Sequence, residues 1–201
     1  MLYTRRIEQS LPNDAHFTVS RTFAIRFREE VGGYRVEGEQ VAVEVDAPES
    51  LAAFAEMERE RHEQALFPLL LSHDGLIEGG DPPDGAAPDR AVQEVLHRIA
   101  ELPLPADDQA ELGRFARAVH ANAAALLTQL PRDLFAPAEE ESRHRQTLAL
   151  PGGDEGNVTV AFAAETEPAT GLMRSARREV VTEFGGNRRR TLESWTLVPT
   201  R

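Results

Sequence analysis

The sequence contains no cysteine among its 201 residues. Disulfide bonds, thiolate metal sites and cysteine nucleophiles are therefore excluded. It contains no lysine either, so all 22 basic residues are arginine. Without lysine the chain cannot form a Schiff base with a carbonyl substrate, and it lacks the lysine of a phosphate-binding P-loop.

Long apolar runs are also missing, and none approaches the roughly 20 residues that a membrane-spanning helix needs. The N-terminus shows no basic region followed by an apolar stretch, which is the pattern of a secretory signal. Met1 leads almost directly into strand-like sequence. We therefore expect a cytoplasmic protein, or a periplasmic one if a leader was removed before Met1.

Positive charge is scarce overall, and the net charge of the chain is −12. This balance opposes binding to nucleic acid, where neutralisation of phosphates supplies much of the affinity. Hydrophobic residues make up 41% of the chain and charged residues 28%. Both fractions are ordinary for a folded soluble protein, so we expect a globular chain.

The best-specified stretch of the sequence is a hairpin near its N-terminus. Apolar and polar residues alternate over residues 17–31, which is typical of a strand with one face on a core. Gly32-Gly33 predicts a two-residue turn, and a second strand follows over residues 34–45. This turn implies three opposite-charge pairs on one face: Glu30–Arg35, Arg28–Glu37 and Arg26–Glu39.

The second strand of this hairpin changes phase near Gly38. Its apolar residues move from even to odd positions, first Tyr34 and Val36, then Val41, Val43 and Val45. An unbroken strand would therefore expose three valines. One extra residue near 38–40 would bring Ile25 opposite Val41 and Phe23 opposite Val43, so we predict a β-bulge there that bends the sheet. The alternative is a sheet covered on both faces.

The middle of the chain, residues 47–130, reads as mainly helical. A capping-box pattern at Asp46-Ala47-Pro48-Glu49 predicts a helix that runs to about Ala65. A short hairpin is expected around His73-Asp74-Gly75. Two further helices are predicted over residues 90–102 and 108–130, the second with a regular apolar stripe.

Strand patterns return in the C-terminal part, residues 141–198. The predicted strands are Ser142–Leu150, a segment centred on residues 158–163, Met173–Phe184 and Arg189–Val198. We expect them to share one sheet with the N-terminal strands of residues 2–45. The chain 1–201 thus reads as a single α+β domain, a curved antiparallel sheet with about three helices packed on one face.

This order of strands, helices and strands resembles half-barrel proteins of the lipoprotein-carrier type. The resemblance lies in the topology, and it implies a cavity between sheet and helices that holds acyl chains. The residues expected to line such a cavity are Phe23, Phe27, Val43, Leu127 and Trp195. The alternative is that these five are plain core residues.

Motifs for catalysis or metal binding are not found. None of the six histidines stands in an HExxH pattern, and Glu58 with His62 supplies only two ligands at helical spacing. No nucleophile elbow, dinucleotide-binding glycine motif or P-loop occurs. We therefore predict no catalytic residue, no metal site and no cofactor.

A local excess of arginine marks the C-terminal end, where residues 157–201 carry seven arginines and five acidic residues. It indicates either a docking place for an anion or acidic partner, or a hairpin edge charged to discourage aggregation. The arginines concerned are Arg174, Arg177, Arg178, Arg188, Arg189 and Arg190.

Three functions remain open at this point. The first is a non-catalytic binding or carrier protein for an apolar or amphipathic ligand, either a hydrophobic small molecule or a lipid. The second is a structural or interaction module that acts through a sheet edge or an acidic surface, which leaves a homodimer open. The third is an enzyme, for which the sequence offers no convergent acid, base and nucleophile.

Overall fold

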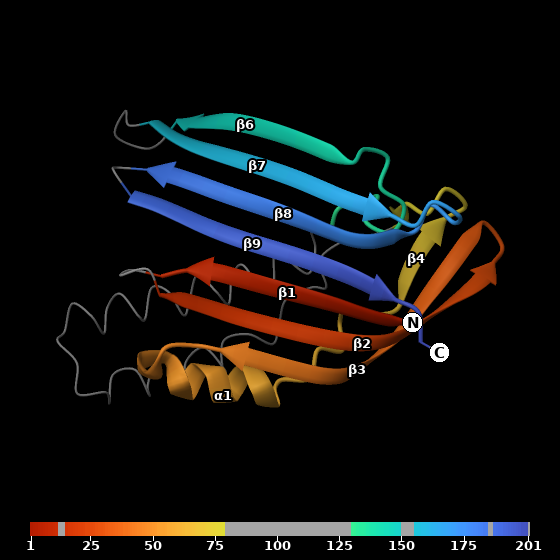
Figure 1. Ribbon diagram of the computed structural model, residues 1–201, viewed down its shortest axis with the longest axis horizontal. Helices are drawn as coiled ribbons and strands as arrows, with labels where there is room; N and C mark the ends of the chain where they lie inside the picture. Colours follow the sequence, from red (N-terminus) through yellow and green to blue (C-terminus); the bar gives the residue numbers. More distant parts are fainter. Residues whose placement is uncertain (12–14, 79–129, 150–154, 185–186, 201) are drawn as a thin grey trace. The chain divides into compact units, whose positions relative to one another are not determined.

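The computed structural model describes residues 1–11, 15–78, 130–149, 155–184 and 187–200. They form one nine-stranded antiparallel sheet in the order β5-β4-β3-β2-β1-β9-β8-β7-β6. Figure 1 shows the order from β3 to β6. Its strands are β1 (Leu2–Ser10), β2 (His16–Glu30), β3 (Gly33–Asp46), β4 (Leu69–Ser72), β5 (Ile77–Glu78), β6 (Glu141–Ala149), β7 (Glu155–Thr166), β8 (Met173–Phe184) and β9 (Asn187–Val198).

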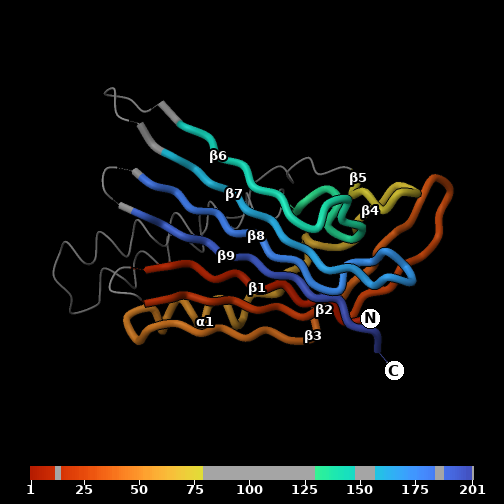
Figure 2. The backbone as a smooth tube through the Cα atoms, turned by 45° about the horizontal axis from the view of Figure 1, so that its top comes forward, coloured from red at the N-terminus to blue at the C-terminus, as the bar shows by residue number. Residues whose placement is uncertain are grey.

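The sheet joins two meanders, β1 to β5 and β6 to β9, through the pairing of β1 with β9. Leu2 faces Val198 at one end of this pairing, and Gln9 faces Thr191 at the other. The prediction that N-terminal and C-terminal strands share one curved antiparallel sheet is therefore confirmed. Figure 2 shows the curvature and twist of the strands. The reading of the chain as a single domain stays a prediction.

The prediction of about three helices on one face is not borne out, since the described residues contain one short α-helix, α1 (Ala52–Glu60). A 3₁₀ turn, Glu49–Leu51, precedes it. The expected capping box is wrong because Asp46 ends β3 and neither helix start has a side-chain cap. The predicted helices over 90–102 and 108–130 lie, apart from Leu130, outside the described residues.

The register of the first hairpin differs from the prediction by two residues. The turn lies at Val31-Gly32, so that Glu30 faces Gly33 and Arg26 faces Glu37. Gly33 belongs to the strand because β4 runs against it: a Cβ there would lie 1.9 Å from the carbonyl oxygen of Leu71. A shift of two keeps every side chain on its predicted face.

The predicted bulge exists, but its extra residue is Val41 rather than one of residues 38–40. Thr22 faces Ala42 and Phe23 faces Gln40, so Val41 is left without a partner on β2. Val41 is 55% exposed, whereas Val43 is half-buried. The bulge therefore restores the buried phase for Val43 and Val45 but not for Val41.

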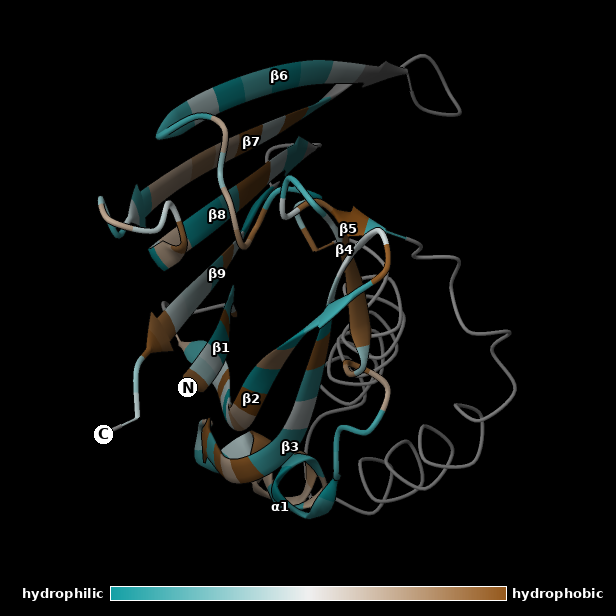
Figure 3. Ribbon diagram, turned by 90° about the vertical axis from the view of Figure 1, so that its right-hand side faces the viewer, coloured by the Kyte–Doolittle hydropathy of each residue, from teal (hydrophilic) through white to brown (hydrophobic). Residues whose placement is uncertain are grey.

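One face of the sheet, here called the inner face, carries the odd-numbered residues of β1 and β2. Tyr3 and Phe23 face each other on it, and the ring of Phe67 packs against both, at centroid distances of 5.9 and 5.3 Å. Phe135 adds a third contact to Tyr3 at 5.9 Å. The alternation of apolar and polar bands along the strands is visible in Figure 3.

Gly38 leaves the space that Phe67 occupies, because a Cβ on Gly38 would lie 2.5 Å from the Phe67 ring. Gly38→Ala should therefore displace this ring and lower the free energy of unfolding by roughly 1–3 kcal/mol. Urea unfolding followed by tryptophan fluorescence measures the loss. The neighbouring exposed change Glu39→Ala is the matched control, and equal stabilities of the two variants would contradict the packing argument.

Candidate functional site

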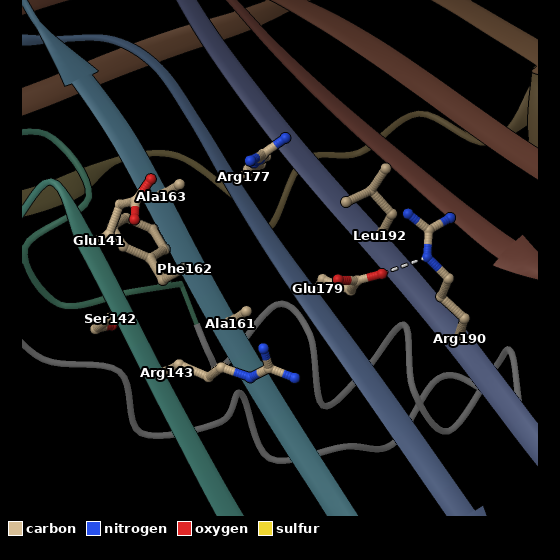
Figure 4. Close-up of a pocket in the computed structure, with 10 residues that line it drawn as sticks. All are labelled: Glu141, Ser142, Arg143, Ala161, Phe162, Ala163, Arg177, Glu179, Arg190 and Leu192. Carbon is tan, nitrogen blue, oxygen red and sulfur yellow. Dashed lines mark hydrogen bonds and ion pairs between the residues drawn. The ribbon is translucent and has the colours of Figure 1, made fainter.

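A groove lies on the opposite, outer face of the sheet, over β6 to β9. Its volume is about 520 Å³, within the range of roughly 300–1,000 Å³ of small-molecule sites. Ten residues line it: Glu141, Ser142, Arg143, Ala161, Phe162, Ala163, Arg177, Glu179, Arg190 and Leu192 (Figure 4).

The strand registers explain why these residues meet. Glu141 faces Ala163, which in turn faces Arg177 on β8. The next row on the same face is Arg143, Ala161, Glu179 and Leu192. Two adjacent rows of an antiparallel sheet thus bring residues from four strands onto one surface.

The groove has a low apolar floor and a charged rim. Ala161 and Ala163 present only methyl groups from β7, so no side chain of that strand fills the space above them. Longer side chains rise beside them, Arg143 from β6 and Arg177 from β8 (Figure 4). The hollow therefore results from small residues in one strand between long residues in its neighbours.

The charges of the groove are unevenly paired. Arg190 Nε donates a hydrogen bond to Glu179 Oε1 at 2.5 Å, and this bond lowers the pKa of the Glu179 carboxyl below its usual value. Arg190 also lies 3.4 Å from a carboxylate oxygen of Glu8. Among the described residues, Arg143 and Arg177 have no carboxylate within 4.0 Å. Glu141 of the lining also has no ion-pair partner among the described residues, so the groove holds two unpaired arginines and one unpaired carboxylate.

On the inner face below, a buried carboxylate joins β8, β9 and β1. Glu193 is 1% exposed and accepts hydrogen bonds from Nε of Arg178 (3.0 Å) and from Nη2 of Arg5 (3.2 Å). The guanidinium of Arg178 also lies over the ring of Trp195, 5.7 Å from its centroid. This network links β8, β9 and β1 on the inner face, and Arg178 therefore lies on the side of the sheet opposite to the groove.

A second buried ion pair attaches α1 to the sheet. Glu58 Oε2 accepts a hydrogen bond from Arg21 Nη2 at 2.8 Å, and Arg61 approaches the same oxygen at 3.1 Å. Glu58 is buried where it pairs with Arg21, whereas His62 lies beyond the end of the helix and is exposed. The two residues therefore do not form the ligand pair that helical spacing would give.

Four of the five residues expected to line an inner cavity are described. Phe23 packs against Tyr3 and Phe67, and Phe27 against Phe135 at 5.6 Å. Trp195 is fully buried, and Val43 is half-buried opposite Arg21. Leu127 lies outside the described residues. All four belong to the inner face, but their role as a ligand cavity stays a prediction.

The C-terminal arginines do not form a hairpin edge, because β8 and β9 are interior strands of the sheet. Arg177 and Arg190 point into the groove, while Arg178 points to the inner face. The sequence reading did not identify Ala161, Ala163 or Leu192. The alternation of Ala161 and Ala163 with Val158, Val160 and Phe162 on β7 was the available signal for these two alanines. It indicates a groove only once the neighbouring strands are known.

Within the described ranges no three histidine or carboxylate side chains converge on a possible metal site. In the same ranges, no helix is both long and apolar enough to cross a bilayer. Comparison of the chain with protein-family models, curated proteins and solved structures finds no match. The site must therefore be interpreted from its geometry.

Removal of the buried carboxylate should be costly. Glu193→Ala leaves Arg5 and Arg178 buried without it, and we expect a loss of roughly 3–5 kcal/mol in the free energy of unfolding. The matched control is Glu183→Ala on the same hairpin. It removes a 3.9 Å ion pair with Arg188 in which both side chains are more than half exposed. That change should cost less than about 1 kcal/mol. Comparable losses in urea unfolding would contradict the role of Glu193.

Proposed function

We propose that the protein binds an amphipathic organic anion in the outer-face groove and serves as a binding or carrier protein for it. One observation carries the proposal: Arg177 stands beside an apolar floor in a groove of about 520 Å³ with no carboxylate partner among the described residues. A ligand with an apolar body and one anionic group complements both parts.

The anionic group is placed at Arg177. A guanidinium presents paired N–H donors that match a carboxylate or a phosphate in a bidentate arrangement. Arg190 is less suited because Glu179 and Glu8 already occupy it. A charge-assisted hydrogen bond of this kind contributes roughly 1.5–3 kcal/mol, enough to select an anion over a neutral analogue.

The apolar body is placed on Ala161, Ala163 and Leu192. These residues come from strands on both sides of β8 and form the uncharged part of the lining. Because they belong to paired strands, the floor is already formed before the ligand arrives. Little conformational entropy is then lost on binding.

Octanoate is the probe for this site, with octan-1-ol as a neutral ligand of equal chain length. We expect octanoate to bind more tightly than octan-1-ol, and Arg177→Ala to weaken octanoate binding roughly tenfold or more. Ala161→Leu should weaken both ligands because it fills the floor. Isothermal titration calorimetry measures the affinities.

Arg174→Ala is the matched control, since Arg174 lies on the same strand, outside the groove, and pairs with Glu167 at 3.9 Å. Its octanoate affinity should equal that of the unmodified chain. Equal binding of octanoate to the Arg177→Ala and Arg174→Ala variants would overturn the proposed position of the anion. Absence of octanoate and inorganic phosphate binding to the unmodified chain would overturn the site.

A second candidate is an apolar ligand held on the inner face, as in the lipoprotein-carrier half-barrels that the topology resembles. The observation in its favour is a group of half-buried apolar side chains on that face of β7 and β8: Val158, Val160 and Val180. This ligand would be a lipid or another hydrophobic small molecule.

Native mass spectrometry of the purified protein separates the two candidates. A lipid held on the inner face should be lost from Val160→Asp, which places a carboxylate among the apolar side chains, and kept by Arg177→Ala. A ligand in the outer groove gives the opposite pattern. Retention of a co-purified lipid by Val160→Asp would contradict the inner-face candidate.

A further inference from the structure

The edge strand β6 has a charge pattern that is complementary to itself. Within the described residues, β6 is the last strand of the sheet and pairs with β7 alone (Figure 1). Three acidic residues, Glu139 to Glu141, precede Ser142, and Arg143, His144 and Arg145 follow it. The charges are thus opposite in sign on the two sides of Ser142.

We propose that two copies of the chain pair antiparallel through β6, with a two-fold axis at Ser142. In this register Glu141 of each copy faces Arg143 of the other within β6, and Glu139, which lies two residues before the start of β6, faces Arg145. Glu140 faces His144, which adds attraction when the imidazole is protonated. Each opposite-charge pair forms twice, because a two-fold interface repeats every contact.

The backbone of β6 presents the donors and acceptors that this pairing needs. The carbonyl oxygen of Glu140 accepts a hydrogen bond from the Ala164 N–H at 2.8 Å, so even-numbered residues bond to β7. In an antiparallel ladder the intervening residues then direct their N–H and C=O groups away from β7. Glu141, Arg143 and Arg145 therefore offer these groups to a second copy.

The side chains of this edge are available for the contact. Glu139, Glu140, Glu141, Arg143, His144 and Arg145 are all exposed. None of the six has an ion-pair partner within 4.0 Å in the part of the chain that the structure describes. Elsewhere on the sheet exposed charges do pair, as Arg28 does with Glu37 at 2.9 Å.

Other two-fold registers of the same edge place like charges opposite each other. An axis at Glu141 sets two glutamates face to face beside a Glu139–Arg143 pair. An axis at Arg143 sets two arginines face to face beside a Glu141–Arg145 pair. An axis at His144 places Arg143 opposite Arg145. Like charges directly opposite each other destabilise a strand pair, so the axis at Ser142 is the register that these charges favour.

The pairing would also extend the outer groove. Glu141 and Arg143 belong to its lining, so the second copy would add an arginine and a glutamate at the open rim. Arg177 lies two strands away from the new contact and stays available to a ligand. The dimer does not rest on the proposed function, because its critical residues and those of ligand binding can be changed separately.

Charge reversal on β6 tests the inference. Sedimentation velocity of the unmodified chain at roughly 0.1 mM should show a dimer, since specific interfaces reach micromolar or tighter affinity. Arg143→Glu and Glu141→Arg should each raise the dissociation constant roughly tenfold or more, because each sets like charges opposite each other. An equimolar mixture of the two variants should restore the dimer, since every facing pair is again opposite in sign.

Arg6→Glu is the control for a change of net charge, because Arg6 is exposed on β1, four strands from β6. It should leave the dimer unchanged, and circular dichroism should show the same sheet content in every variant. A monomeric unmodified chain would overturn the inference. So would a dimer that survives both single reversals, or a mixture that stays monomeric.

Discussion

The pairing of β1 with β9 is the contact on which the rest of the sheet depends. It joins strands from opposite ends of the chain. Forming it therefore costs the conformational entropy of closing a loop that contains all the residues between β1 and β9. Once it forms, Arg5 lies beside Trp195 and Ile7 beside Glu193. The buried carboxylate and its two arginines thereby come from three neighbouring strands. Two separate meanders become one sheet with a common inner face.

The two faces of the C-terminal meander differ in chemistry. Arg177 and Arg178 are adjacent in sequence but point to opposite faces, one to the groove and the other to Glu193. Glu179 returns to the outer face and holds Arg190. Alternation along one strand thus separates an arginine that binds a buried carboxylate from an arginine that lines the groove.

Local patterns predicted the strands well, because alternation of apolar and polar residues reports the face of each side chain directly. Met173–Phe184 was predicted with its observed ends, and the β3 bulge was predicted one residue from its place. The errors came from contacts distant in sequence. Gly33 left the predicted turn because β4 packs against it, and Asp46 was taken into β3 instead of capping a helix. The groove could not be predicted for the same reason, because its residues become neighbours only through the order and register of β6 to β9.

The sequence by itself determined the antiparallel strands, the faces of their side chains and the self-complementary charges of residues 139–145. Each of these follows from spacing along one segment, where the period of two is set by backbone geometry. Only the tertiary structure decided that Ala161 and Ala163 lie between long side chains, that Glu193 is buried among arginines, and that β6 is the last strand among the described residues. These outcomes depend on which strands become neighbours, and that choice is made by packing and pairing over the whole chain.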